Sequence, residues 1–206
     1  MRSKWINRVL SVALLFTTLT TSVSYTFSTA YAEEAGASTQ QSAQSGVSWP
    51  EAPEISAGNG ILIDADTGAI LYEKNAYTKC YPASTTKILT GLLTVENCSM
   101  DETVTFSRAA ANSVTWEDSN LAKVGEQYTV EQALYGLLLY SANEIAYGLA
   151  EHVGGSLENF VEMMNARARE LGAVNTHFAN ASGLYDPNHY TTAYDMAMIA
   201  RGCYNN

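Results

Sequence analysis

Basic residues are scarce in this chain. Eleven Lys and Arg stand against twenty-one Asp and Glu, which gives a formal net charge of −10 at pH 7. Three of the eleven are Arg2, Lys4 and Arg8 at the N-terminus, so the chain beyond them carries eight basic residues and a net charge of −13. A polypeptide this acidic repels phosphate backbones. We therefore expect no nucleic acid among its partners.

Cysteine is also scarce, with Cys80, Cys98 and Cys203 as the three examples. Their number is odd, so they do not form an even framework of bridges. Cys80 and Cys98 flank a predicted helix about 20 Å long, well beyond the ~7 Å limit between bridged Cα atoms, and we expect free or buried thiols. The cysteine spacing fits no zinc site, and the three histidines do not cluster with the cysteines in sequence. No metal and no cofactor are therefore expected.

Long apolar runs are absent as well. The strongest apolar segment, 9–16, is too short to cross a bilayer comfortably. It follows the N-terminal basic residues and precedes a polar run that ends Ala30-Tyr31-Ala32. This order predicts a secretory signal peptide over 1–32, cleaved after Ala32, and hence an exported protein. An uncleaved signal anchor is the alternative.

Large apolar side chains are rare from 33 to 54, where Ala, Ser, Gln and Gly predominate. Such a segment buries too little surface to offset its ordering entropy, so we interpret it as a flexible tether. The remaining residues, 55–206, are enough for one domain with a hydrophobic core. No internal repeat divides them.

The periodicities within 55–206 predict an α+β domain. Two β-prone runs between Gly60 and Asn75, joined at Asp66-Thr67-Gly68, indicate a hairpin. An extended piece is expected at 103–106, and polar or loop-rich stretches at 116–127 and 177–190. The rest is helical by its apolar spacing and its capping residues. Helices are expected from Pro82, after Ser107, at 133–140, at 144–153, after Ser156 and after Thr192.

The most informative stretch runs from Tyr81 to Lys87 and reads Tyr-Pro-Ala-Ser-Thr-Thr-Lys. Pro82 suits the first turn of a helix, and side chains three residues apart share a helical face, so Ser84 and Lys87 can meet. A serine hydroxyl becomes an effective nucleophile when a base removes its proton, and a lysine can be that base when its surroundings lower its pKa. The alternative is ordinary: Ser84 as a helix cap and Lys87 as a solvated charge.

A second polar pair, Ser141 and Asn143, separates two apolar helical stretches. Residues two apart do not share a helical face, but in a turn both side chains can point into one cleft. The alternative is a plain connection between helices, in which the two residues serve as caps.

Read in order, five segments resemble the low-molecular-mass penicillin-binding proteins that act as serine-type D-alanyl-D-alanine carboxypeptidases. The resemblance extends from about Ile55 to Arg201. The segments are the hairpin around Ile63 to Tyr72, Tyr81 to Lys87, Ser141-Ala-Asn-Glu, Phe178-Ala-Asn-Ala-Ser-Gly-Leu and Thr191-Thr-Ala-Tyr-Asp-Met-Ala.

The resemblance implies a β-lactamase/transpeptidase-like α+β fold, a helical cluster packed on an antiparallel sheet. It also implies roles for four residues. Ser84 would attack the carbonyl between the terminal D-alanines of a peptidoglycan pentapeptide, with Lys87 as general base. Ser141 would relay a proton, and Asn143 would bind the substrate and help orient Lys87. Penicillins and other β-lactams would acylate the same serine. A Lys87 that only stabilises charge is the alternative for the base.

The sequence departs from the family motifs at its end. Enzymes of this kind combine SxxK and an SxN-type triplet with a Lys-Thr-Gly triplet, and the last is absent from these 206 residues. In the family that triplet lies on a later strand, which also supplies one of the two oxyanion-hole N–H groups. The resemblance therefore implies the N-terminal part of a catalytic domain, with the C-terminal strands of its sheet missing and with apolar helix faces exposed where they would pack.

Three functional alternatives follow from these motifs. The first is a carboxypeptidase, the second a non-catalytic chain that binds wall peptides or β-lactams, and the third a β-lactamase. The third is disfavoured because no Glu-x-x-x-Asn pattern is present for a deacylating glutamate. A Ser-His-Asp hydrolase is disfavoured because the chain has no GxSxG elbow. The resemblance also implies a location in the cell wall or on the outer face of the membrane, with peripheral membrane association through a C-terminal region not in this chain.

Overall fold

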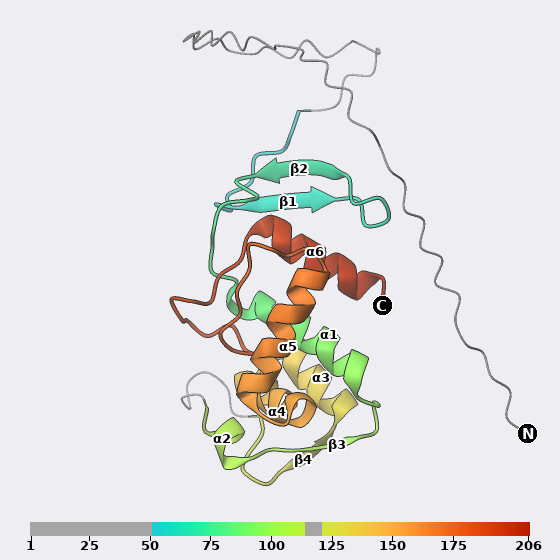
Figure 1. The fold of residues 1–206 in the computed structure, drawn as a ribbon, viewed down its shortest axis with the longest axis vertical. Helices are drawn as coiled ribbons and strands as arrows, with labels where there is room; N and C mark the ends of the chain where they lie inside the picture. Colours follow the sequence, from blue (N-terminus) through green and yellow to red (C-terminus); the bar gives the residue numbers. More distant parts are fainter. Residues whose placement is uncertain (1–50, 114–120) are drawn as a thin grey trace, which may run out of the picture. The chain divides into compact units, whose positions relative to one another are not determined.

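The computed structural model describes residues 51–113 and 121–206. The predicted signal peptide and most of the predicted tether lie outside the described residues, as does part of the polar loop expected at 116–127. Among the helices that are described, none is long and apolar enough to cross a membrane. The architecture is α+β, as expected: helices dominate and two small antiparallel sheets accompany them (Figure 1).

The predicted hairpin is confirmed. Strand β1 (Gly60–Ile63) pairs antiparallel with β2 (Ile70–Lys74), with Gly60 opposite Lys74. Asp64 closes the connecting loop, since its carboxylate accepts the backbone N–H of Thr67 at 2.7 Å. The hairpin lies beside the C-terminal helix (Figure 1).

Four of the described helices begin directly after a residue whose side chain caps them. Thr129 and Gln132 form a complete capping box, which starts the following helix at Val130 rather than at the expected residue 133. Ser156 and Thr192 each accept a backbone N–H three residues ahead. The helices are α1 (Lys87–Asn97), α2 (Arg108–Ala111), α3 (Val130–Leu139), α4 (Asn143–Gly154), α5 (Leu157–Glu170) and α6 (Ala193–Tyr204).

A second strand pair was not fully anticipated. The extended piece expected at 103–106 is β3 (Thr103–Thr105), and it pairs antiparallel with β4 (Gln127–Thr129). No strand was expected at 127–129, because the segment is only three residues long and lies beside a polar stretch. Its strand structure depends on hydrogen bonds to β3, more than twenty residues earlier in the sequence.

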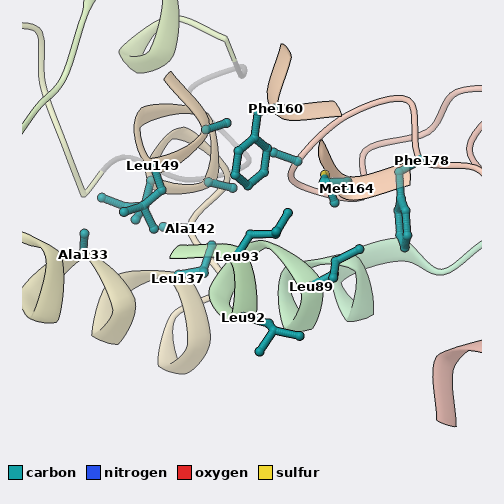
Figure 2. Packing of buried hydrophobic residues seen from close by; sticks show 14 of the residues in the cluster. Leu89, Leu92, Leu93, Ala133, Leu137, Ala142, Leu149, Phe160, Met164 and Phe178 are labelled. Atoms are coloured by element: carbon teal, nitrogen blue, oxygen red, sulfur yellow. The ribbon is translucent and has the colours of Figure 1, made fainter. Parts of the chain in front are cut away.

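Helices α1, α3, α4 and α5 surround the hydrophobic core (Figures 1 and 2). Gly148 on α4 permits a close approach, because a Cβ there would lie 2.4 Å from a ring carbon of Phe106. The buried side chains labelled in Figure 2 come from the helices and from the segments between them: Leu89, Leu92, Leu93, Ala133, Leu137, Ala142, Leu149, Phe160, Met164 and Phe178.

Apolar side chains also remain exposed outside this core. Val95 of α1 is 42% exposed. Together with Leu138 of α3 and Cys203 of α6 it lines an apolar groove. The sequence predicted exposed apolar helix faces where further strands would pack, and the covering of this groove by such strands stays a prediction.

Candidate active site

Ser84 and Lys87 meet at the start of α1, as their spacing predicted. Ser84 lies in a short 3-10 turn, η1 (Ala83–Thr86), and Lys87 is the first residue of α1. One continuous helix was expected through both residues. Instead, a short 3-10 turn that contains Ser84 precedes the α-helix. Lys87 Nζ lies 3.2 Å from Ser84 Oγ. Ser84 is exposed whereas Lys87 is 2% exposed, so an accessible hydroxyl contacts a buried amine.

Two further acceptors surround the Lys87 amine. Its Nζ donates to Asn143 Oδ1 at 2.7 Å and to the backbone carbonyl of Ser182 at 2.8 Å. These partners come from the start of α4 and from the loop before α6, so the site joins three distant parts of the chain. With three acceptors, a protonated Lys87 uses all of its N–H groups.

Burial makes the charged form of this lysine unfavourable. Desolvation lowers the pKa of Lys87 to about 8, although the nearby Glu144 carboxylate acts in the opposite direction. Glu144 is itself fully buried, and its Oε1 accepts the backbone N–H groups of Leu121 and Ala122 at 2.5 and 3.2 Å. Lys87 therefore has an accessible neutral form near physiological pH, which a general base requires.

The geometry also orients that neutral form. The carbonyl oxygens of Asn143 and Ser182 can only accept, so the two shorter hydrogen bonds consume the two N–H groups of a neutral amine. The nitrogen lone pair is left toward the third partner, the Ser84 hydroxyl. In this state Ser84 donates to Lys87, which is the arrangement that activates a serine.

The loop that supplies the Ser182 carbonyl packs closely against Ala83, the residue before Ser84. Asn180 Oδ1 accepts the N–H groups of Ser182 and Gly183, at 3.1 and 2.7 Å. Gly183 adopts a φ of +89°, and a Cβ there would lie 1.8 Å from the carbonyl oxygen of Ala83. Only glycine fits this contact. Ala83 itself has a φ of +48°, so the residue just before Ser84 is in the left-handed region.

A buried histidine ties the same loop to η1. His189 Nδ1 accepts the N–H of Ala179 at 3.1 Å, which leaves Nε2 to carry the proton and donate to Thr86 Oγ1 at 2.8 Å. Burial lowers the pKa of His189 to about 4, so the ring stays neutral in this role. His189 thus connects residues 103 positions apart in the sequence.

Ser141 occupies the predicted break between α3 and α4, with a φ of +59°. Asn143 begins α4 and reaches Lys87, as proposed from the sequence. Ser141 is partly buried, but within the described residues no hydrogen bond joins it to Ser84 or Lys87. Of the four predicted site residues, Lys87 therefore contacts Ser84 and Asn143 directly. Ser141 lies two positions before Asn143 in the sequence.

Sequence reasoning assigned no role to the Ser182 carbonyl, Glu144 or His189. Ser182 and Glu144 lie in segments that carried the family resemblance, so the signal for them was present at the level of motifs. His189 had no such signal, because a single histidine in a loop carries no spacing pattern.

Comparison with known proteins gives consistent results. A sequence profile for D-alanyl-D-alanine carboxypeptidases matches residues 46–206. D-alanyl-D-alanine carboxypeptidase DacF of Bacillus subtilis is 40% identical over 150 residues, which cover 70% of this chain and 38% of that protein. DacC of Escherichia coli is 34% identical over 160 residues, or 73% of this chain and 40% of DacC. The chain thus spans about two fifths of the length of these relatives.

Solved structures agree in fold. The D-alanyl-D-alanine carboxypeptidase DacD of Francisella tularensis has a TM-score of 0.73 at 35% identity, over 80% of this chain and 41% of that one. Penicillin-binding protein 5 of Haemophilus influenzae has a TM-score of 0.71 at 32% identity, over 76% and 47% respectively. The α+β fold expected from the sequence is therefore confirmed as the transpeptidase/β-lactamase fold of the penicillin-binding proteins.

Proposed function

Because the chain belongs to the D-alanyl-D-alanine carboxypeptidase family, we propose that the protein removes the C-terminal D-alanine from peptidoglycan pentapeptides through an acyl ester on Ser84. The observation that carries the proposal is the 3.2 Å contact between Ser84 Oγ and the buried Lys87 amine, whose remaining neighbours are both pure acceptors.

The reaction follows from that contact. Neutral Lys87 takes the hydroxyl proton as Ser84 Oγ attacks the carbonyl between the two D-alanines. The resulting ammonium is stabilised by the oxygens of Asn143 and Ser182. Collapse of the tetrahedral intermediate breaks the peptide bond, and the departing amine receives a proton, so D-alanine is released. Water then hydrolyses the ester and frees the tetrapeptide.

Ser141 and Asn143 complete the proposed machinery. Ser141 lies at the turn that begins α4, and from there it would pass the proton from Lys87 toward the leaving amine. Asn143 would orient Lys87 through Oδ1 and hydrogen-bond the substrate backbone as well. The negative charge that develops on the substrate carbonyl would be stabilised by the Ser84 N–H and by a second donor from the Lys-Thr-Gly strand of the family.

Penicillins and other β-lactams would acylate Ser84 in the same way, since their strained amide resembles the scissile dipeptide. The substrate is found outside the cytoplasm, which agrees with the secretory signal predicted for 1–32. Peripheral membrane association through a C-terminal region remains part of this proposal.

Labelling with a fluorescent penicillin, followed by mass spectrometry of the modified peptide, tests the proposal. We expect one adduct, on Ser84, and no adduct in Ser84→Ala. Ser113→Ala removes a serine hydroxyl outside the site and should label normally. An adduct on another residue, or undiminished labelling of Ser84→Ala, would refute the assignment.

Turnover and the role of Lys87 require a second measurement. D-alanine release from a synthetic peptide ending in D-Ala-D-Ala distinguishes a carboxypeptidase from a chain that is acylated without turnover. Lys87→Ala and Lys87→Arg separate a base from a cation, because arginine keeps the charge but does not deprotonate. If Lys87 is the base, both variants should acylate at least about a hundredfold more slowly. Normal acylation of either one would exclude it as the base.

A further inference from the structure

Three metal-ligating side chains meet at the opposite end of α1 from Lys87. One ligand atom from each of Cys98, Glu102 and His152 lies within 4.8 Å of the other two. Cys98 immediately follows α1, Glu102 precedes β3, and His152 lies in the last turn of α4. Sequence spacing gives no sign of this cluster, because Glu102 and His152 are 50 residues apart.

The backbone around the cluster is well fixed. The N–H of Cys98 donates to the Thr94 carbonyl at 3.0 Å, and the carboxylate of Glu102 accepts the N–H of Ser99 at 2.6 Å. The Glu102 carbonyl accepts the N–H of Val130 at 2.9 Å. Helices α1 and α4 pack directly against each other. The three potential metal ligands therefore lie on segments that the fold already holds together.

The donor set matches one class of ion. Thiolate, imidazole and carboxylate together are typical ligands of Zn²⁺ and chemically similar ions, whereas Ca²⁺ and Mg²⁺ take oxygen ligands. The distance between His152 Nε2 and Glu102 Oε2 is 3.2 Å. Two ligands of a tetrahedral zinc ion, each about 2.0 Å from the metal, are separated by roughly 3.3 Å. One edge of such a site is thus already in place.

We propose that Cys98, Glu102 and His152 bind a zinc-class divalent cation through one sulfur, one oxygen and one nitrogen. Coordination replaces the Cys98 thiol proton, which passes to solvent, and the Nε2 proton of the hydrogen bond from His152 to Glu102, which moves to Nδ1 or to solvent. The three residues are partly accessible, so water can complete a fourth position. The ion would tie the connection after α1 to the end of α4. Because it lies at the far end of α1 from Ser84, its role would be structural.

Titration of the protein with Co²⁺, without a polyhistidine tag, tests this proposal. We expect one equivalent to bind with the visible absorption of tetrahedral cobalt and a thiolate charge-transfer band, both abolished by Zn²⁺. The thermal midpoint of unfolding should rise with added Zn²⁺, since the ion binds the folded state. Weak octahedral binding without a thiolate band would overturn the proposal.

Variants locate the site. Cys98→Ser should remove the charge-transfer band, and His152→Ala should weaken binding by more than about a hundredfold. Glu102→Gln changes an exposed side chain, so weaker Co²⁺ binding at an unchanged circular dichroism spectrum would support the site even if the other variants fold poorly. Cys203→Ser is the matched control and should bind as the parent does. A charge-transfer band that survives in Cys98→Ser and disappears in Cys203→Ser would contradict the assignment.

Discussion

The two ends of helix α1 use polar side chains in opposite ways. At its N-terminal end Lys87 is buried, and its amine contacts Ser84, Asn143 and a backbone carbonyl. At its C-terminal end Cys98, Glu102 and His152 are at least partly accessible to solvent. Folding alone buries the first group, and this desolvation lowers the pKa of Lys87. The second group places three potential metal ligands near the surface, where a cation from solution can bind to them.

This difference explains why the two ends should respond to different perturbations. Reactivity at the buried end depends on packing and on charges inside the protein. At the exposed end, charged side chains interact with each other only weakly. The interactions there therefore depend more on the ions in solution than on packing. Substitutions at the buried end should therefore have the larger effects.

The largest effect is expected for Gly183→Ala. The new Cβ would overlap the Ala83 carbonyl oxygen and displace Ser84, in addition to requiring a left-handed φ. We expect a loss of about 3 kcal/mol or more in the free energy of unfolding, measured by urea titration, together with loss of penicillin acylation.

Gly172→Ala is the matched control for this variant. Gly172 has nearly the same φ, +88°, but no atom lies within 4 Å of its would-be Cβ. It should lose only about 1 kcal/mol, the backbone cost alone. Equal losses in the two variants would show that the contact with Ala83 is not important.

A smaller effect is expected from protonation of His189. Its pKa is lowered from 6.5 to about 4 in the folded protein, so between these values the unfolded chain binds a proton that the folded protein does not. Stability should therefore fall as the pH falls through this window. We expect a loss of about 2 kcal/mol between about pH 7 and pH 4.5 beyond that of His189→Gln, from urea titrations.

The exposed His177 provides the control for this pH effect. His177→Gln should keep most of the pH dependence of the parent protein, because burial is the largest cause of the lowered His189 pKa and the charge of His177 is the smallest. If His189→Gln lost stability on acidification as steeply as the parent, the buried histidine would not be its source.

The pH profile of acylation tests the buried charge near Lys87. In the proposed mechanism neutral Lys87 is the active form, so the rate of penicillin acylation should rise with pH through about 8. Glu144 raises the pKa of Lys87, and Glu144→Gln should therefore move the profile to lower pH. Glu158→Gln, in the first turn of α5, should leave it unchanged. A shift to higher pH would contradict the proposed interaction.

The smallest effect is expected near the exposed end of α1. Arg167 binds Glu96 through Nε and a terminal nitrogen, with a shortest N–O distance of 2.6 Å. Arg167→Lys loses this paired geometry but keeps the charge. We expect a decrease of about 0.5 kcal/mol in the free energy of unfolding, reduced further by salt. Arg169→Lys on the same helix is the control, and an equal decrease there would argue against a specific pair.

Much of the local structure could be predicted from the sequence. The hairpin, the capping box at Thr129, the cap at Ser156 and the contact between Ser84 and Lys87 all depend on residues a few positions apart. Such features follow from backbone geometry and from the three- and four-residue spacing of helical faces. The family motifs added Asn143 to the site, because its segment resembles that of known enzymes.

The amino-acid sequence by itself thus determined most of the secondary-structure elements and the meeting of Ser84 with its neighbouring lysine. Only the tertiary structure decided what surrounds them. The Ser182 carbonyl lies 95 residues from Lys87 in the sequence, and His189 lies 103 residues from Thr86. The pairing of β3 with β4 and the meeting of Cys98 with His152 are equally non-local. Burial and pKa depend on these long-range contacts, since desolvation of Lys87 requires α4 and the Ser182 loop to close over it.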